Sequence, residues 1–130
     1  MSGLTYADAS ALVKLVVEEP ESRAMNRWFV ESTRVTTSRL GLIEMLRASA
    51  RRDHDPGHRE QLVRDVEVIE LSPTISVAAA SLQPAILRTL DAIHVASALA
   101  LGAELDAFVT YDDRLAEAAR AIGLPVVRPA

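Results

Sequence analysis

Hydrophobic positions along this chain alternate between short runs typical of strands and longer stretches with helical spacing. The first short run, 4–7, predicts a strand that passes directly into a helix, with Asp8 and Ser10 at the junction. A carboxylate or hydroxyl there can accept a backbone N–H of the first helical turn. A strand that turns at once into a helix is typical of the first β–α unit of a parallel sheet. Polar residues just after such strands lie at the carboxyl edge of the sheet, where ligands bind.

The rest of the chain predicts alternating elements of the same two kinds. Strands are expected at 33–37, 66–71, 107–110 and 125–127. Helices are expected from Pro20, at 39–52, at 59–65, from Pro73, at 89–99 and from 113 to a stop at Gly123. The expected caps of three of these helices are Ser38, Thr89 and the pair Asp112 and Asp113. The order β-α-α-β-α-α-β-α-α-β-α-β predicts an α/β fold with a parallel sheet, in one domain over residues 1–130.

Composition narrows the class of protein. Hydrophobic residues make up 49% of the chain and charged residues 25%, which argues against disorder. The chain has no cysteine, which excludes disulfides, cysteine zinc sites and thiol nucleophiles. No apolar run approaches the roughly 20 residues needed to cross a bilayer, and the N-terminus lacks a signal-peptide pattern. We therefore expect a cytoplasmic protein that does not associate with membranes.

The net charge of −4 gives no overall attraction to nucleic acid, but arginines gather between positions 47 and 64. Acidic residues are interspersed among them, so this stretch is either a mixed, solvated face or a local phosphate-contacting patch. His54 and His58 have the i, i+4 spacing of a helical metal pair. Because Pro56 and Gly57 lie between them and interrupt the helix, we do not expect a zinc site there.

Two helical stretches each allow two interpretations. Met25, Trp28 and Phe29 recur at i, i+3 and i+4, which suits either core packing or the lining of a partner groove. Glu44 lies among apolar neighbours of its own helix, where a carboxylate needs a positive partner. Arg47, three residues further on, could provide that partner in a purely structural pair.

Four acids that are distant in sequence can meet at one edge of the predicted sheet. Asp8 and Asp112 each follow a strand, so their carboxylates converge if those strands are neighbours. Glu44 and Asp91 lie on helices that begin at the same edge, although the helix dipole alone also explains Asp91 in a first turn. His94, on the same helix as Asp91, is expected to hydrogen-bond locally rather than to act as a ligand.

Gathering these carboxylates requires a compensating charge. Two of them about 6 Å apart repel by ~3 kcal/mol at an effective dielectric constant of about 20, so a cluster of four demands metal or protonation. A set of oxygen ligands without cysteine favours Mg²⁺ or Mn²⁺. A hydrated divalent ion on carboxylates serves phosphoryl chemistry, because it activates a water and neutralises charge on the phosphate.

Four segments carry a resemblance to a known family: TYADASALVKL at 5–15, SRLGLIEMLRA at 38–48, LRTLDAIHVASAL at 87–99 and FVTYDDRLAEAARAIGLPVV at 108–127. Together they make the chain resemble the PIN domain over essentially its whole length, and specifically the toxins of VapBC toxin–antitoxin pairs. The resemblance implies a three-layer α/β/α sandwich around a twisted parallel sheet of about five short strands. It also implies that Mg²⁺ or Mn²⁺ is held by the family's catalytic acidic quartet, here Asp8, Glu44, Asp91 and Asp112. Supporting roles fall to the hydroxyls of Ser10 and Thr110 and to Asp113 as an outer or capping acid.

The same resemblance implies a function and partners. It implies an endoribonuclease that cuts single-stranded regions of tRNA, rRNA or mRNA and leaves a 3′-hydroxyl and a 5′-phosphate. It further implies a homodimer and a VapB-type antitoxin that covers the active site, in a heterotetramer or larger complex. The candidate antitoxin-binding surface on the first two helices consists of Leu12, Val16, Met25, Trp28 and Phe29.

Three other classes of protein remain as alternatives. A phosphoacceptor signalling domain also gathers acids and Mg²⁺ at the carboxyl edge of a similar sheet, but it needs adjacent acids after the first strand, where Asp8 stands alone. A dehalogenase-type phosphatase needs a second aspartate two residues later, where this chain has Ser10. A catalytically idle binding module on the PIN fold is the third, and the intact set of four acids argues against it.

Overall fold

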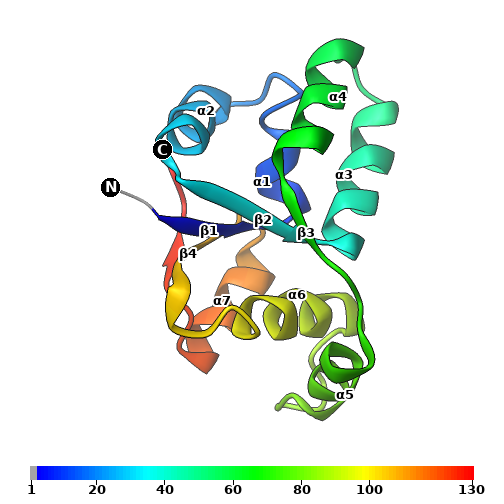
Figure 1. The fold of residues 1–130 in the computed structure, drawn as a ribbon, viewed down its shortest axis with the longest axis vertical. Coiled ribbons are helices and arrows are strands. Elements are labelled where there is room, and N and C mark those ends of the chain that lie inside the picture. Colours follow the sequence, from blue (N-terminus) through cyan, green and yellow to red (C-terminus); the bar gives the residue numbers. More distant parts are fainter. Residues whose placement is uncertain (1–2) are drawn as a thin grey trace.

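A parallel sheet of five strands organises the computed structural model, which describes residues 3–130 (Figure 1). The strands lie side by side in the order β3-β2-β1-β4-β5, so the first strand of the chain is the central one. Their bounds are β1 (Leu4–Ala7), β2 (Arg34–Ser38), β3 (Glu67–Ile69), β4 (Leu105–Val109) and β5 (Val126–Val127). The predicted fold class and the predicted order of strands and helices are confirmed.

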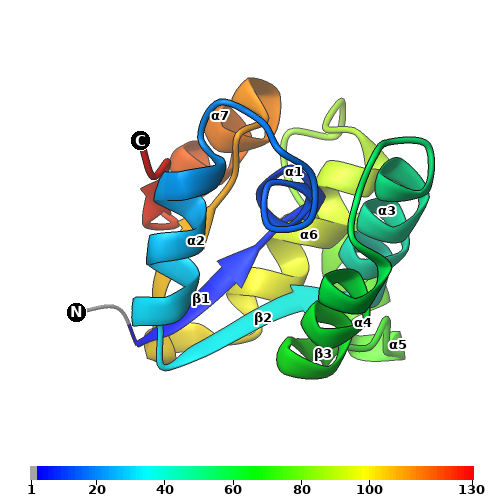
Figure 2. The ribbon, with the colours of Figure 1, turned by 90° about the horizontal axis from the view of Figure 1, so that it is seen from above.

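Helices cover both faces of the sheet, which gives three layers (Figure 1). One layer holds α1 (Ala9–Val13), α2 (Ser22–Glu31), α3 (Arg39–Ala50) and α4 (Pro56–Asp65). The other holds α5 (Pro73–Ser81), α6 (Thr89–Leu99) and α7 (Asp113–Ile122). A short 3₁₀ helix (Gly102–Glu104) leads into β4. Seen from above, β1 runs directly into α1, and α1 and α2 lie over β1 and β2 (Figure 2).

The core lies on the two faces of the central strands, because successive side chains of a strand point to opposite faces. On the α6 side, Tyr6 stacks on Phe108 with ring centroids 5.2 Å apart. On the α1 side, Leu12, Met25 and Met45 pack together in a second cluster. Aliphatic side chains supply most of the remaining buried area, as the low aromatic content of 4% requires.

Several helix boundaries differ from those predicted. The Pro56-Gly57 pair opens α4 rather than interrupting it, since Asp55 caps the helix and Pro56 occupies its first turn, where a missing N–H is tolerated. Thr89 is already helical, and Arg88 holds the N-cap position of α6 without a side-chain cap bond. No helix among residues 3–130 is long and apolar enough to cross a membrane.

Candidate active site

The carboxyl ends of β1 and β4 form the part of the sheet edge where the chain changes direction. From β1 the chain builds the sheet outward through β2 and β3, and later returns to the other side of β1 as β4. The helices that follow the two strands, α1 and α7, lie on opposite faces (Figure 1). In open parallel sheets such a switch point leaves a crevice, and ligands bind there.

Asp8, directly after β1, is buried and held by three hydrogen bonds. Its Oδ1 accepts from the Ser10 hydroxyl (2.7 Å) and from the backbone N–H of Ala11 (3.1 Å), which makes Asp8 the N-cap of α1. Its Oδ2 accepts from the Thr110 hydroxyl (2.7 Å), which follows the neighbouring strand β4. Burial raises the pKa of Asp8, and the hydrogen bonds from Ser10 and Thr110 oppose that rise.

Asp112 lies three residues beyond the end of β4 and caps α7. Its Oδ1 accepts from the backbone N–H groups of Arg114 (2.9 Å) and Leu115 (3.1 Å). Its own backbone N–H donates to Thr110 Oγ1 (3.0 Å), so the hydroxyl that donates to Asp8 also orders the turn before α7. The strands that precede the two aspartates are neighbours, as convergence of their carboxylates requires.

Asp91 lies in the first turn of α6 and is 8% exposed. Within residues 3–130, its Oδ2 atom is buried and has no hydrogen-bond partner. Burial is the main reason that the pKa of Asp91 is raised, and the negative charges of Asp112 and Glu44 raise it further. The positive charge of Arg88 acts in the opposite direction. An unpaired carboxylate oxygen of this kind is costly to bury, which is typical of functional sites.

Glu44, in the second turn of α3, contacts α6 rather than its own helix. Its Oε1 lies 2.8 Å from His94 Nε2, and His94 Nδ1 lies 2.7 Å from the Tyr6 hydroxyl. The expected local pair with Arg47 is therefore replaced by a contact that spans fifty positions of sequence. The expectation of a local hydrogen bond for His94 is wrong, because both of its ring nitrogens contact residues far away in the chain.

Three of the four acids are coupled electrostatically, but they do not form a closed ligand shell. The negative charges of Asp112 and Glu44 act on Asp91, whereas Asp8 is held by Ser10, Ala11 and Thr110. Among residues 3–130, however, no three His, Asp or Glu side chains stand in an arrangement that could hold a metal ion. The binding of one cation by all four acids therefore stays a prediction.

A concave surface of about 310 Å³ adjoins Glu44, one of the four acids, and carries cations on its wall. Glu44 and Ser10 line it together with Lys14 and Arg52. Both cations contact Glu19, since Lys14 Nζ lies 3.3 Å from one of its carboxylate oxygens and Arg52 Nη1 lies 3.0 Å from the other. Lys14 also pairs with Glu21 (2.8 Å) and is largely buried, so Arg52 is the more exposed of the two cations that could meet a phosphate.

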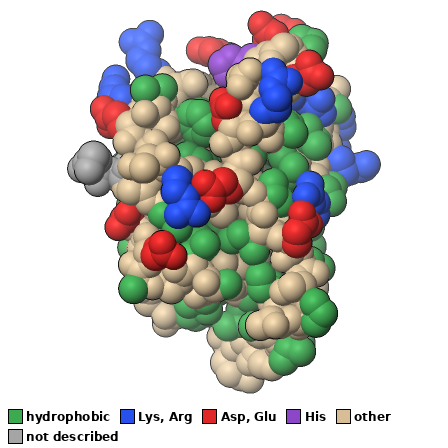
Figure 3. Space-filling view, in the orientation of Figure 1, with side chains coloured by type: hydrophobic (Ala, Val, Ile, Leu, Met, Phe, Trp, Pro, Cys, Tyr) green, Lys and Arg blue, Asp and Glu red, His purple; other side chains and the backbone are tan. Residues whose placement is uncertain are grey.

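The arginine-rich stretch between 47 and 64 is a mixed face in part. The guanidinium of Arg59 donates to Ser49 Oγ (2.8 Å) and to the Leu46 carbonyl (2.9 Å), and that of Arg64 donates to Gln61 (2.8 Å). Figure 3 shows acidic and basic side chains interspersed over one side of the molecule. Arg59 and Arg64 are thus bound by partners within the protein, and Arg52 is the arginine of this stretch that lines the concave surface with Glu44.

The candidate antitoxin-binding residues divide into two groups. Leu12, Val16 and Met25 are buried in the core, so their side chains do not form surface in this chain. Trp28 and Phe29 are partly buried and remain candidates. This division corrects the predicted surface, because helical spacing marks an apolar face without showing how much of it the sheet covers.

Asp113 lies in the first turn of α7, next to the capping Asp112. Its carboxylate is largely exposed and pairs with Arg128. Its role as an outer acid of the site stays a prediction.

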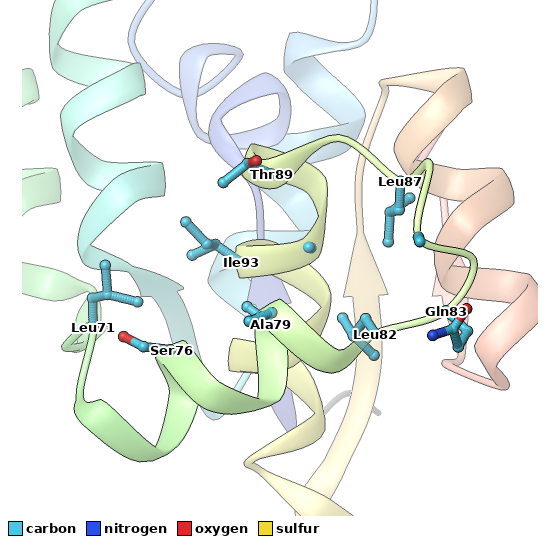
Figure 4. Close-up of a pocket in the computed structure, with 11 residues that line it drawn as sticks. Leu71, Ser76, Ala79, Leu82, Gln83, Leu87, Thr89 and Ile93 are labelled. Atoms are coloured by element: carbon cyan, nitrogen blue, oxygen red, sulfur yellow. The ribbon is translucent and has the colours of Figure 1, made fainter.

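A second cavity, of about 370 Å³, lies between α5 and the first turns of α6 (Figure 4). Leu71, Leu82 and Ile93 are among its eleven lining residues, none of which is titratable. It therefore offers no acid or base, and the chemistry of the molecule is better assigned to the sheet edge.

Tyr6 and Lys14 are residues near the site that the sequence did not single out, and the contacts of His94 differ from those predicted. A polar ring on an Ala-rich helix and a single lysine among fourteen basic residues were the available signals. Neither signal identifies a partner, because the partners come from other elements of the fold.

Comparison with known families gives a match along most of the chain. The model of the family described as PIN domain matches residues 5–121. Three ribonucleases of Mycobacterium tuberculosis are similar over nearly the full length. VapC47 is 37% identical, and the match covers 97% of both chains. VapC46 is 40% identical, and the match covers 95% of this chain and 96% of VapC46. VapC35 is 41% identical, and the match covers 97% of both chains.

Solved structures share the fold at low sequence identity. The crystal structure of Mycobacterium tuberculosis VapC20, named as a sarcin-ricin loop cleaving toxin, superposes with a TM-score of 0.71 at 18% identity and covers 96% of this chain and 99% of its own. VapBC2 from Rickettsia felis, bound to a DNA fragment from its promoter, gives a TM-score of 0.68 at 16% identity, with 98% and 99% covered.

Proposed function

The chain belongs to the PIN domain family and is similar to VapC ribonucleases along its whole length, and from this premise we propose that it is the endoribonuclease toxin of a type II toxin–antitoxin pair. The observation that carries the proposal is the sheet edge at β1 and β4, where Asp8 and Asp112 cap the helices that follow these neighbouring strands and Asp91 keeps a buried oxygen without a partner among residues 3–130. Asp91 and its neighbours provide hard oxygen donors, which fit Mg²⁺ or Mn²⁺.

Asp8, Glu44, Asp91 and Asp112 would hold the ion. When bound, Mg²⁺ or Mn²⁺ supplies an activated water and neutralises charge on the scissile phosphate. Ser10 and Thr110 hold both carboxylate oxygens of Asp8 in fixed directions through hydrogen bonds of 2.7 Å. Hydrolysis in this geometry is proposed to leave a 3′-hydroxyl and a 5′-phosphate.

The RNA is proposed to cross the concave surface that Glu44 shares with Lys14 and Arg52. Since the whole chain is negatively charged, phosphate binding depends on such local cations. Single-stranded regions of tRNA, rRNA or mRNA are the proposed substrate class.

An antitoxin of the VapB kind is the proposed partner. Phe29 and the 80% exposed Val30 line a groove of about 230 Å³ between α2 and α4, next to Trp28 on the same helix. An apolar segment of the antitoxin would bury these side chains. We also propose that the toxin forms a homodimer, and that two toxins and two antitoxins form the smallest complex.

Cleavage of RNA by the purified protein tests the proposed function. We expect cleavage of single-stranded RNA with Mg²⁺ or Mn²⁺, no cleavage with excess chelator, and recovery when the ion is restored. Sequencing the 5′ ends produced during brief induction identifies the substrate. Cleavage that persists in chelator, or products that carry a 2′,3′-cyclic phosphate, would contradict the metal-dependent mechanism.

A further inference from the structure

A chain of two hydrogen bonds connects the core of the molecule to Glu44. Tyr6 on β1 is fully buried and His94 on α6 is 3% exposed. The Tyr6 hydroxyl lies 2.7 Å from His94 Nδ1, and His94 Nε2 lies 2.8 Å from Glu44 Oε1. The three residues come from β1, α6 and α3, so the tertiary fold alone brings them together.

The chemistry of the groups fixes the direction of these hydrogen bonds. An ionised carboxylate only accepts, so the proton between His94 and Glu44 belongs to Nε2. A tyrosine hydroxyl carries its proton at neutral pH, so the Tyr6 hydroxyl, 2.7 Å away, can donate to Nδ1 of a neutral imidazole. The hydrogen bond from Tyr6 therefore keeps Nδ1 without hydrogen. Nε2 then carries the hydrogen that His94 donates to Glu44.

Packing holds both rings in place. Tyr6 stacks on Phe108 and meets His94 edge-on, with an angle of 79° between the ring planes. On the other side of the imidazole, α3 approaches closely at Gly41. A Cβ atom there would lie 3.2 Å from His94 Cε1 and 2.3 Å from Thr37 Oγ1, so only glycine allows this approach. Glu44 follows one helical turn later on the same face of α3.

We propose that Tyr6 and His94 are positioning residues for Glu44: the Tyr6 hydroxyl donates to His94 Nδ1, and His94 Nε2–H donates to Glu44 Oε1, which leaves the second oxygen of Glu44 for a divalent ion. The inference rests on the proposed function, because it gives Glu44 the role of a metal ligand. Outer hydrogen bonds of this kind orient the ligands that they contact, and their loss weakens metal affinity by about 10–100-fold.

Metal affinity, measured without RNA, tests the positioning role. We expect Tyr6→Phe, which removes only the hydroxyl, to weaken Mn²⁺ binding by about tenfold in titration calorimetry, and His94→Leu to weaken it by up to about 100-fold. His94→Gln should recover part of the affinity, since its amide can still donate to Glu44. A merely structural role would not distinguish His94→Gln from His94→Leu in affinity.

Thr5→Val is the matched control. Thr5 lies beside Tyr6 on the same strand, is equally buried, and its hydroxyl accepts a hydrogen bond from Trp28 Nε1 (3.1 Å) on the opposite face of the sheet. Its loss should lower the melting temperature but leave Mn²⁺ affinity unchanged. Equal Mn²⁺ affinity in wild type, Tyr6→Phe and His94→Leu would overturn the inference.

The imidazole of the wild-type protein gives a second, independent test that needs no variant. In ¹⁵N NMR, we expect hydrogen on Nε2 of His94 and none on Nδ1; hydrogen on Nδ1 would overturn the proposed direction. Wild-type protein that binds Mn²⁺ and cleaves RNA while its variants bind equally well contradicts the positioning role alone. Wild-type protein that neither binds Mn²⁺ nor cleaves RNA contradicts the proposed function and the inference together.

Discussion

The two halves of the acidic sheet edge are built in different ways. Asp8 lies between β1 and α1, and both of its carboxylate oxygens accept hydrogen bonds. The donors follow β1 or the neighbouring strand β4. Asp91 and Glu44 sit on helices from opposite layers, and the buried Oδ2 of Asp91 has no partner within residues 3–130. The first half therefore stabilises the fold while it orients a ligand, whereas the second half keeps an oxygen unpaired at the expense of stability.

The largest predicted effect is on catalysis, and it comes from Asp8, in the half of the site that stabilises the fold. Asp8→Asn should retain the cap of α1, because asparagine and aspartate cap equally well. RNA cleavage should fall by at least about 10²–10³-fold, the scale expected for losing a main electrostatic contribution at a reacting centre. Cleavage rate and far-UV circular dichroism measure the two quantities.

Asp55→Asn is the control for Asp8→Asn, since Asp55 caps α4 in the same way and lies outside the proposed site. It should leave both cleavage and helix content unchanged. Full cleavage activity in the Asp8→Asn protein would refute the assignment of Asp8 as a ligand.

Removing a support of Asp8 should have an intermediate effect. Thr110→Val keeps the shape of the side chain but deletes the hydrogen bonds to Asp8 Oδ2 and from the Asp112 backbone N–H. We expect Mn²⁺ affinity to fall by about 10–100-fold. Thr36→Val on β2 is the matched control, because the Thr36 hydroxyl is buried and has no hydrogen-bond partner among the described residues. If the two variants bind Mn²⁺ equally, Thr110 does not support the site.

In the second half of the site, replacing the unpaired acid Asp91 should raise the stability of the fold. Because the pKa of Asp91 is raised in the folded state, this carboxyl favours folding most when it is protonated at low pH, and that contribution is lost as the pH rises through the raised pKa. Without added metal, Asp91→Asn should therefore raise the free energy of unfolding at pH 7.5 by about 1 kcal/mol, and by less at pH 4. Urea unfolding at both pH values measures the difference.

Asp113→Asn provides the comparison for Asp91→Asn, since Asp113 also lies in a first helical turn but is exposed and paired with Arg128. Its replacement should lower stability slightly, because it removes a favourable charge near a helix N-terminus. A loss of stability in both variants would mean that Asp91 is a helix-dipole residue and carries no functional strain.

The same contrast explains what the sequence could predict. The caps Asp8, Ser38 and Asp112 are local features, since each side chain accepts from backbone N–H groups two or three residues later. Adjacency of β1 and β4 was the condition for Asp8 and Asp112 to converge, and the structure meets that condition. The order of elements was likewise readable from periodicity, and the structure confirms it.

Long-range contacts were out of reach of that reasoning. Tyr6 and His94 are 88 positions apart, and His94 and Glu44 are 50 apart, so no spacing rule connects them. Burial was misjudged for a related reason. Leu12 and Met25 are predicted as antitoxin-binding surface but are fully buried, because they pack in the core cluster beneath the first two helices. Periodicity identifies an apolar stripe, and the packing of other elements decides whether it is covered.

The smallest predicted effect concerns the rim of the site, which lies outside both halves. Arg52→Gln removes one of the two cations on the concave surface, while Glu19 keeps its contact with Lys14. Binding of single-stranded RNA to catalytically inactive Asp8→Asn protein should weaken a few-fold, and the slope of log K against log salt should fall by about 0.7 for the lost phosphate contact. Arg64→Gln, in the same arginine-rich stretch but bonded to Gln61, should change neither quantity. Equal slopes for the two variants would place the RNA backbone elsewhere, because the loss of a phosphate contact must appear in the salt dependence.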